Sequence, residues 1–427
     1  MKRVAVIGAG YAGLAAAVEL AAAGIPVTVF EASRTLGGRA RSVEIEGIAL
    51  DNGQHILSGA YRETLRLMEM VGAAPQRLLL RQSLLLEYPG EFRIAAPQLP
   101  APLHLAAALL CAKGISWLDK WAAIRFMRKL KATNFRLAHD LPLADLLAAE
   151  RQSPRVRGYL WEPLCVAALN TPTEYASSQI FANVLRDSLA AARVDSDLLL
   201  PLTDLTQLFP QPAEQFIDAH GGAIKRGVRV EHIRFEDAQF RINEEEDASS
   251  HVILAVAPYH LAAFATGLPA LAEAAAQVTA FSYEPIVTAY LAYPESVRLP
   301  QPMLGHADGN LQWLFDRGQL GGPVGLLAAV ISARGRHQDL PPDQLVAQLH
   351  EEIRGILPNL PAPLWSRVIV EKRATFACTP GLVRPAMQTP QAGLLLAGDY
   401  IASDYPATIE SAVRSGINAA KQISELS

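Results

Sequence analysis

The sequence predicts an α/β protein in which a nucleotide-binding domain, assembled from separate segments of the chain, carries an inserted α+β domain. Three observations support this class. A glycine-rich turn follows an apolar run at Val4–Ile7, a second apolar run ends at Glu31, and a third run near the carboxyl end stops at Gly398 and Asp399. Glycine turns and carboxylates at strand ends are typical of open α/β sheets that bind nucleotides. We therefore expect both ends of the chain in one domain.

Composition excludes several classes of protein. The length of 427 residues predicts two or three domains. Half of the residues are hydrophobic and only 19% are charged, which argues against a disordered chain. A net charge of −4 gives no general case for nucleic-acid binding. No apolar run reaches the roughly 18 residues of a membrane-spanning helix, so we expect a cytoplasmic protein, soluble or peripheral on the inner face of the membrane. Three widely spaced cysteines argue against a disulfide framework or a metal site and are expected to be buried thiols: Cys111, Cys165 and Cys378.

The amino-terminal segment reads as a βαβ unit. Val4–Ile7 is a buried strand, residues 14–23 a helix and residues 27–30 a second strand. The apolar start could also be a secretory signal, but a signal would not need the glycines or the acidic residue that follow. In the turn, Gly8 permits a sharp bend, Gly10 lets a pyrophosphate approach the backbone and Gly13 lets the helix pack on the sheet. The whole turn, with Tyr11 and Ala12, is expected to bind a dinucleotide.

Glu31 and the residues after it define the cofactor more closely. A carboxylate about twenty residues beyond the first glycine binds ribose hydroxyls and disfavours a 2′-phosphate, and Ala32 lies beside it. Gly38 and Arg39 then bring a planar cation near a pyrophosphate or flavin, although the same residues could form a solvated turn. Near the carboxyl end, Gly398 and Asp399 end a strand, and Asp399 can accept hydrogen bonds from ribityl or ribose hydroxyls. A helix beginning near Ala407, Thr408 and Ile409 would point its amino terminus at the flavin.

The remaining pattern places the inserted domain. Residues 101–190 look helical, 228–242 alternate like strands, and 244–247 mark an exposed turn. Strands are also expected at 252–256, 281–293, 324–331 and 394–397, and helices at 341–357 and 407–423. We assign 1–80, 205–260 and 370–427 to a Rossmann-like FAD-binding domain. Residues 81–204 and 261–369 then form the substrate-binding domain.

Together these residues resemble the flavin amine oxidase and phytoene desaturase superfamily. Its pattern appears as Gly8 to Gly13, Glu31, Leu36-Gly-Gly-Arg39, Ala397-Gly-Asp399 and Glu410-Ser-Ala412. The resemblance implies non-covalent FAD, because Cys378 is not in the Gly-Gly-Cys setting of a covalent flavin link. It also places Val230 against the adenine, where an ordinary core valine is the alternative.

A narrower resemblance is to the hydroxysqualene dehydroxylase family. It rests on Asp51-Asn-Gly-Gln-His55, Tyr61-Arg-Glu63, Trp161-Glu-Pro163, Asn170-Thr-Pro172, Leu200-Pro-Leu202 and Thr379-Pro-Gly381. The family implies reductive removal of the allylic hydroxyl of hydroxysqualene, an isoprenoid lipid, in bacterial squalene and hopanoid synthesis. We expect Gly53, Gln54 and His55 to contact the cofactor. No second dinucleotide fingerprint is present, so the unidentified electron donor is expected to be another protein or to bind at a site without a recognisable motif.

The reaction needs an acid that assists the departure of hydroxide. The candidates are His55, Tyr61, Glu162, Asp404 and Tyr405. We select His55, Tyr405 and Glu162 as catalytic candidates. His55 could equally be a buried structural histidine, and Glu162 a structural carboxylate.

Residues 101–136 are apolar and strongly basic. They carry seven cations and one carboxylate, Asp119, a net charge of +6 in a chain that is negative overall. Trp117, Trp121, Ile124, Phe126 and Leu130 lie among the cations. A basic, aromatic segment is typical of a helix that docks on anionic lipid, and a core-packed helix with a solvated basic face is the alternative. Nucleic acid is disfavoured because no binding motif accompanies the charge.

Two other functions use the same scaffold. A carotenoid or phytoene desaturase or isomerase would act on a different polyene, and sequence does not set the direction of electron flow. GDP-dissociation inhibitors share the architecture and bind prenylated partners without using flavin, but the intact Gly10, Glu31, Arg39 and Asp399 disfavour that reading. An amine oxidase is disfavoured because its aromatic cage is not identifiable.

Overall fold

The computed structural model describes residues 2–45, 47–244 and 248–425. Its first sheet has five parallel strands in the order β10-β2-β1-β13-β19. These strands are β10 (Ala223–Arg226), β2 (Val27–Glu31), β1 (Val4–Ile7), β13 (His251–Leu254) and β19 (Leu394–Leu396). Four of these five strands, β1, β2, β13 and β19, lie where the sequence pattern predicted strands. Segments far apart in the chain therefore share one sheet.

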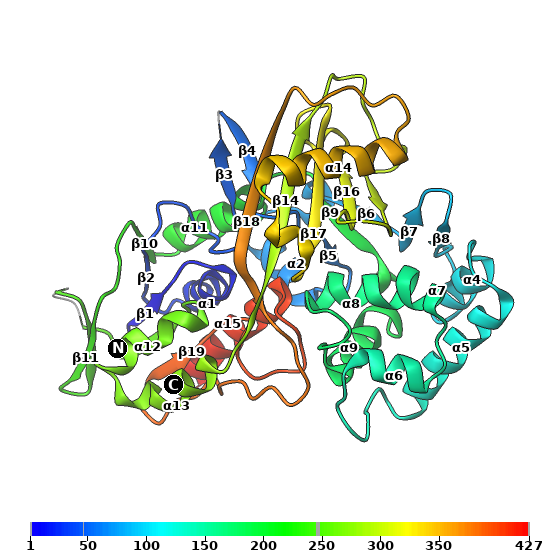
Figure 1. Ribbon diagram of the computed structural model, residues 1–427. Coiled ribbons are helices and arrows are strands. Elements are labelled where there is room, and N and C mark those ends of the chain that lie inside the picture. The colour runs from blue at the N-terminus through cyan, green and yellow to red at the C-terminus, as the bar shows by residue number, and fades with distance from the viewer. Residues whose placement is uncertain (1, 46, 245–247, 426–427) are drawn as a thin grey trace.

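Three helices pack around this sheet. They are α1 (Tyr11–Ala22), α11 (Pro210–Ala219) and α15 (Ile409–Glu425), and α1 contacts both of the others (Figure 1). The contact of α1 with α15 depends on Gly416, where an added Cβ would lie 2.0 Å from the Ala12 carbonyl oxygen. Helix axes approach this closely only where a side chain is missing. The two ends of the chain are therefore packed directly against each other.

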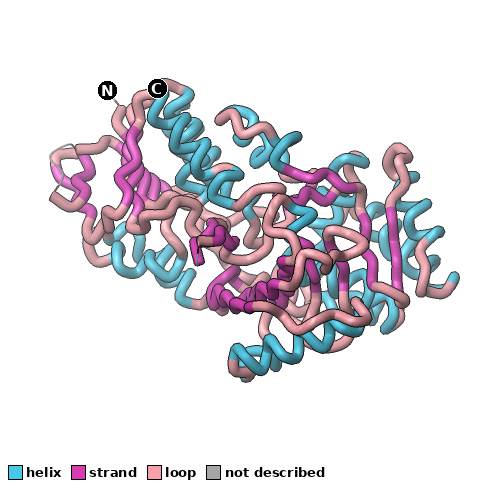
Figure 2. Tube along the Cα trace, turned by 90° about the horizontal axis from the view of Figure 1, so that it is seen from above, coloured by secondary structure: helices cyan, strands magenta, loops and turns pink. Residues whose placement is uncertain are grey.

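The second sheet has five antiparallel strands in the order β15-β16-β17-β14-β18. Its members are β14 (Tyr283–Ala292), β15 (Met303–Gly305), β16 (Trp313–Asp316), β17 (Leu326–Ser332) and β18 (Trp365–Phe376). Helix α14 (Pro342–Ile356) covers one face through Leu345, Leu349 and Ile353, which belong to the same buried cluster as β14 and β17. Seen from above, the chain termini lie at one end of the molecule beside the parallel sheet (Figure 2).

A helical layer occupies the opposite end of the molecule (Figure 1). It contains α4 (Leu103–Cys111), α5 (Trp117–Ala132), α6 (Leu143–Ala149), α7 (Pro154–Val156), α8 (Glu162–Leu169) and α9 (Ser178–Val184), with π-helical turns at Arg157–Trp161 and Leu185–Leu189. None of the helices in the described part of the chain is both long and apolar enough to cross a bilayer.

Short elements join these layers. The strands are β3 (Ser42–Ile45), β4 (Ile48–Asp51), β5 (Leu57–Ser58), β6 (Leu79–Gln82), β7 (Leu85–Tyr88), β8 (Phe92–Ala95), β9 (Leu198–Pro201), β11 (Ile233–Glu236) and β12 (Gln239–Ile242). The helices are α2 (Arg62–Met70), α3 (Pro75–Leu78), α10 (Leu205–Leu208), α12 (Leu261–Ala265) and α13 (Ala272–Thr279), with 3₁₀ turns at Arg193–Ser196, Pro258–His260, Pro269–Leu271, Arg317–Leu320 and Arg336–Asp339.

Several sequence expectations need correction. Strand structure in 228–242 begins only at Ile233, because 227–228 are held by backbone bonds to residues 31 and 33 instead. Helix α1 begins at Tyr11 rather than residue 14, since Gly10 already has the extended backbone of a helix cap. Cys165 and Cys378 are buried, but Cys111 is exposed on the last turn of α4. The expected turn at 244–247 lies outside the described residues except for Glu244.

Candidate functional site

The first part of the site is the turn between β1 and α1. Gly8 has a φ of +105°, and an added Cβ would lie 2.6 Å from the Ala255 carbonyl oxygen on the neighbouring strand's end. At Gly13 a Cβ would lie 1.9 Å from the Gly8 carbonyl oxygen. Both positions therefore require glycine, which keeps the turn tight and the amino terminus of α1 close to the sheet.

A second glycine turn closes on the first. The Gly37 N–H donates to the Ala9 carbonyl oxygen at 2.9 Å, and a Cβ on Gly38 would lie 3.1 Å from the Gly10 Cα. Within the described residues, α1 has no side-chain cap and no acidic residue in its first turn. An uncapped helix amino terminus beside two glycine turns offers N–H groups and a positive dipole end to an anion. The cradle therefore fits a pyrophosphate.

Glu31 is placed at the edge of this cradle. Its carboxylate accepts the N–H of Ala9 and the N–H of Ser33, each at 2.7 Å. The segment after β10 is anchored here, because the Val228 N–H donates to the Glu31 carbonyl oxygen. Val230, 9% exposed, follows on that segment, and Ala32 is exposed next to Glu31. The predicted ribose and adenine residues thus lie together beyond the carboxyl ends of β2 and β10.

Arg39 and Asp399 join the two ends of the chain in an ion pair. The Arg39 guanidinium donates to the Asp399 carboxylate at 2.7 Å and to the Ala374 carbonyl oxygen at 2.6 Å. Burial alone would lower the pKa of Arg39, but Asp399, together with Tyr259 and Glu371, more than offsets burial and raises the pKa, so the cation persists. Gly398 before Asp399 has a φ of +155°, and a Cβ there would lie 2.4 Å from the Tyr400 ring. Glycine is required for the chain to place Asp399 at this edge.

Two tyrosine hydroxyls near this pair are buried without a hydrogen-bond partner among the described residues: Tyr283 and Tyr400. Burial, and next the Asp399 charge, raise the pKa of Tyr400. Buried hydroxyls in folded proteins are almost always hydrogen-bonded, so these two groups indicate that a polar ligand binds beside them. Together with the cradle, these hydroxyls and the Arg39–Asp399 pair form a set of polar groups that fits a dinucleotide cofactor.

The segment 53–55 forms another wall. Gly53 has a φ of +108°, and the His55 Nδ1 lies 2.9 Å from the Gly53 carbonyl oxygen. Burial, and to a smaller extent the Arg39 charge, lower the pKa of His55, so its imidazole is neutral at pH 7. Gln54 accepts a hydrogen bond at 2.9 Å from Arg317, which also lies 3.6 Å from the Asp51 carboxylate. The segment is therefore fixed by a buried polar network.

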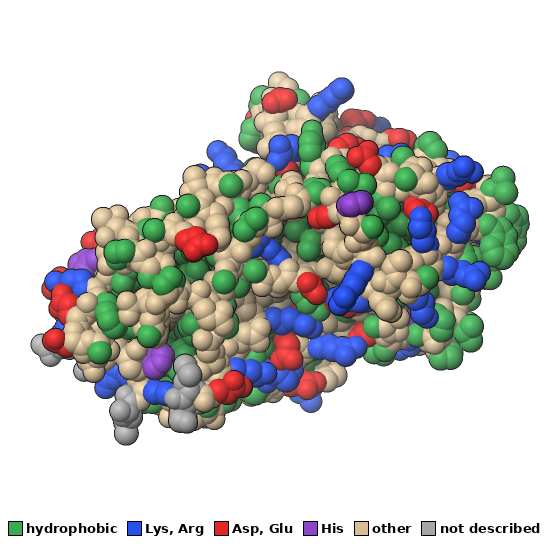
Figure 3. Space-filling model, turned by 90° about the horizontal axis from the view of Figure 1, so that it is seen from below, with side chains coloured by type: hydrophobic (Ala, Val, Ile, Leu, Met, Phe, Trp, Pro, Cys, Tyr) green, Lys and Arg blue, Asp and Glu red, His purple; other side chains and the backbone are tan. Residues whose placement is uncertain are grey.

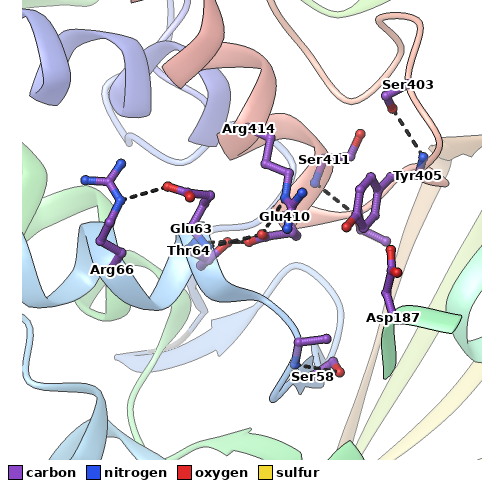
Figure 4. Close-up of polar contacts among 12 residues, drawn as sticks. Ser58, Glu63, Thr64, Arg66, Asp187, Ser403, Tyr405, Glu410, Ser411 and Arg414 are labelled. Carbon is purple, nitrogen blue, oxygen red and sulfur yellow. Dashed lines mark hydrogen bonds and ion pairs between the residues drawn. The ribbon is translucent and has the colours of Figure 1, made fainter. Parts of the chain in front are cut away.

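The amino terminus of α15 carries a second polar cluster, which includes Tyr405, Glu410 and Arg414 (Figure 4). Thr408 caps the helix by accepting the Ser411 N–H at 3.2 Å. The Tyr405 ring lies 4.5 Å from the Arg414 guanidinium, and its hydroxyl interacts with Asp187. Burial raises the pKa of Tyr405 to about 12, with Asp187 adding to the rise, so the phenol keeps its proton at neutral pH. Tyr61 lies in the same cluster, next to Thr408 and Tyr405.

Comparison with known proteins agrees with this geometry. The family model described as flavin containing amine oxidoreductase matches residues 11–424. The chain is 31% identical to a hydroxysqualene dehydroxylase of Rhodopseudomonas palustris, over 98% of this chain and 97% of that protein. It belongs to the hydroxysqualene dehydroxylase family. A zeta-carotene desaturase of Arabidopsis thaliana is more distant, at 23% identity over 99% of this chain and 85% of that protein.

Solved structures support the fold. A crystal structure of an oxidoreductase from Methanosarcina mazei superimposes with a TM-score of 0.76 and 15% identity, over 98% of this chain and all of that one. The predicted α/β class, with its Rossmann-like cofactor domain, is therefore confirmed. Membership of the flavin containing oxidoreductases also confirms the prediction of an FAD-dependent oxidoreductase.

Two of the acid candidates, Glu162 and Asp404, lie apart from the cofactor residues. Glu162 begins α8, 3.7 Å from Arg157, with a side chain 39% exposed. Burial raises the pKa of Glu162, and Arg157 opposes the rise. Asp404 has a side chain 73% exposed and lies 4.0 Å from Arg186. The structure therefore groups His55 with Arg39, and Tyr61 with Tyr405. Asp404 is linked to the Tyr405 cluster through Arg186, which also pairs with Asp187, and Glu162 belongs to neither group.

The sequence pattern did not single out Asp51, Arg317, Tyr283 or Tyr400 as site residues. Asp51 begins a stretch quoted for the family resemblance, but its buried carboxylate had no stated role. Arg317 is 5% exposed and reaches the Asp51–Gln54 segment from the 3₁₀ turn that follows β16, more than 250 residues later in the chain. No local spacing connects the two, and only the tertiary fold reveals the network.

Proposed function

We propose that this protein is an FAD-dependent hydroxysqualene dehydroxylase that reductively removes the hydroxyl of hydroxysqualene to give squalene. The proposal rests chiefly on one observation, the match of this chain over 98% of its length to a hydroxysqualene dehydroxylase. The Arg39–Asp399 pair beside the dinucleotide cradle supports it. Bound FAD, in its reduced form, supplies the hydride that replaces the hydroxyl. The alcohol, a hydride and a proton together give the hydrocarbon and water, so the residues of the chain must bind the lipid and deliver the proton.

Residues of the glycine turns and of the Asp399 edge would hold the cofactor without a covalent bond. We assign this role to Gly8, Gly10, Tyr11, Ala12, Gly13, Glu31, Ala32, Gly38, Arg39, Gly53, Gln54, His55, Val230, Gly398, Asp399, Ala407, Thr408 and Ile409. Tyr11 would contribute through its backbone, because its side chain is buried against Phe209 with the hydroxyl 3.4 Å from the Leu205 carbonyl oxygen.

Tyr405 is the proton donor that we favour. Its phenol remains protonated at neutral pH, and the Arg414 cation over its ring would stabilise the phenolate after transfer. His55 is neutral and would line the site rather than act as a strong acid. Glu162 is retained as a further candidate because its raised pKa makes the carboxyl a better proton carrier near neutral pH.

The domain assignment and the partners complete the proposal. Residues 1–80, 205–260 and 370–427 would form the FAD-binding domain, and 81–204 with 261–369 the substrate domain. Electrons would come from a separate donor protein. We place the protein in the cytoplasm, peripheral on the inner face of the membrane, because a long hydrocarbon substrate partitions into the bilayer.

An anaerobic single turnover tests the reaction. The protein with chemically reduced flavin is mixed with hydroxysqualene in detergent, and flavin absorbance and extracted lipid are followed together. We expect flavin reoxidation that matches squalene formation in amount. Flavin that stays reduced, with no squalene formed, would contradict the proposal and favour a desaturase or isomerase, the function suggested by the more distant zeta-carotene desaturase.

A further inference from the structure

The end of the molecule formed by α4 and α5 exposes large apolar side chains. We define the α4–α5 tip by five residues with their exposed fractions: Leu103 (56%), Leu110 (39%), Trp117 (62%), Leu118 (82%) and Trp121 (59%). Hydrophobic side chains gather visibly at this end, beside Lys and Arg side chains (Figure 3). A contiguous exposed apolar patch on a folded protein indicates a surface that a partner molecule or a membrane covers.

The tip is held in this exposed position by its own framework. Ser116 and Asp119 form a reciprocal capping box at the start of α5. Lys120 is 7% exposed, donates to the Leu110 carbonyl oxygen at 2.7 Å and lies 4.6 Å from the Trp117 ring, which ties α5 to the end of α4. These contacts fix the first turn of α5, so both tryptophans remain at the surface.

Helix α5 separates its apolar residues into two groups. Phe126 and Leu130 are buried in the core, at 1% and 3% exposure, and satisfy the packing of the helix. Trp117 and Trp121, one turn apart, take no part in that core. The sequence pattern alone left open whether the aromatic residues all pack inward, and the structure divides them.

Cations follow the exposed apolar face. Arg125 and Arg128 continue it toward the end of α5, and Lys113 and Lys131 are also exposed. The nearby carboxylates are already engaged, because Asp119 belongs to the capping box and Glu150 pairs with Lys129. The surface therefore presents tryptophan and leucine at its tip and positive charge behind it, which matches the layers of an anionic bilayer.

We propose that the α4–α5 tip inserts into the headgroup region of an anionic membrane and docks the enzyme there. The tip projects from the end of the molecule, and its tryptophans have the amphipathic rings that favour the membrane interface. This docking surface rests on the proposed function and deepens it, because it explains how the enzyme reaches a long hydrocarbon substrate dissolved in the membrane. Its lipid binding can be measured without any reaction.

The tip is connected to the candidate site by packed aromatic residues. Phe126 contacts Trp161 with ring centroids 5.3 Å apart, and Trp161 contacts Phe181 at 6.5 Å. On the same helix as Phe181, Asn183 donates to the Asp404 carbonyl oxygen at 3.1 Å. Asp404 directly precedes Tyr405, so the docked helices and the loop of the proposed proton donor form one continuous packed unit.

Vesicle binding by the full-length, FAD-loaded protein tests the proposal. We expect sedimentation with vesicles of phosphatidylglycerol and phosphatidylcholine, and much weaker sedimentation with phosphatidylcholine alone. Trp117→Ser with Trp121→Ser should lower the partition coefficient roughly 100-fold, because two large apolar surfaces lose their burial. Arg125→Gln with Arg128→Gln should lower it about 25-fold, fivefold for each cation, and only on anionic vesicles.

Matched controls use equally exposed residues elsewhere. Leu364→Ser with Val383→Ser, at 69% and 65% exposure, and Arg298→Gln with Arg336→Gln should leave vesicle binding unchanged. All variants should keep the wild-type single-turnover rate on detergent-dispersed substrate, which separates docking from chemistry. Wild-type vesicle binding by the tryptophan variant would overturn the proposal. So would equal binding of the native protein to neutral vesicles, or a native dimer that the tryptophan substitutions dissociate, which would make the tip an interface between copies.

Discussion

Glu410 stabilises the site from a distance, and its replacement by glutamine gives a sharp test. The carboxylate is fully buried at the first turn of α15 and is reached by four donors (Figure 4). Oε1 accepts the Glu63 N–H at 3.1 Å and the Arg414 Nε at 2.7 Å. Oε2 accepts the Thr64 N–H at 2.9 Å and the Thr64 hydroxyl at 2.8 Å. Because α2 has no side-chain cap of its own at Tyr61, Glu410 caps it from another helix.

Glu410→Gln keeps the size of the side chain but removes one acceptor atom and the charge. In the best orientation the amide oxygen replaces Oε1, and the Thr64 hydroxyl reverses to accept from the new NH₂ group. The Thr64 N–H is then buried without an acceptor, which costs about 1–3 kcal/mol, and the bonds that remain lose their charge assistance. We expect the free energy of unfolding to fall by about 3 kcal/mol.

Equilibrium urea unfolding of the FAD-loaded protein measures this loss. The matched control is Glu351→Gln, the same chemical change in an exposed pair with Arg354, where the side chains are 66% and 52% exposed. Exposed pairs contribute little, so the control should change stability by less than about 0.5 kcal/mol. If both variants lose the same small amount, the tertiary cap does not carry the stability assigned to it.

Three further predictions concern the site. Arg39→Ala should weaken FAD binding by about 10–100-fold, measured by titrating apoprotein with FAD, because the buried Asp399 carboxylate loses its partner; Arg41→Ala, which removes a bond to Ser33, is the control, and an equal effect of both would refute the role of the pair. Tyr405→Phe should lower the single-turnover rate about 10²–10⁴-fold with FAD affinity unchanged, and a wild-type rate would exclude Tyr405 as the acid. Burial raises the pKa of Asp51 from 3.8 to about 6, so its protonated form favours the folded state below pH 4 and this stability is lost as pH rises through 6. The unfolding free energy of the native protein relative to Asp51→Asn should therefore fall by about 2.4 kcal/mol between pH 4 and 8 in urea unfolding, whereas a difference independent of pH would contradict the raised pKa.

The sequence predicted the cofactor half of the fold well because its signals are local. Gly8, Gly13 and Glu31 act through the turn and strand in which they lie, and their spacing reflects backbone geometry that any neighbouring structure must respect. Gly398 and Asp399 follow directly on the strand that ends at Leu396, so predicting that strand also placed these two residues. Periodicity also predicted α14 and β17 to within a residue or two. Boundaries failed where a cap decides them, as at Gly10, or where backbone bonds to a distant strand replace a local strand, as at Val228.

The buried polar networks were beyond the sequence pattern for a physical reason. An arginine at position 317 becomes informative only when the antiparallel sheet brings it to Asp51 and Gln54, and a glutamate at position 410 only when α15 crosses the start of α2. In each case a buried polar side chain from one segment of the chain bonds to polar groups of a segment that is distant in the sequence. The energetic cost of leaving such groups unpaired is what makes the two halves interdependent. We therefore expect that substitutions in these networks weaken cofactor binding and folding together, whereas substitutions at the α4–α5 tip affect neither.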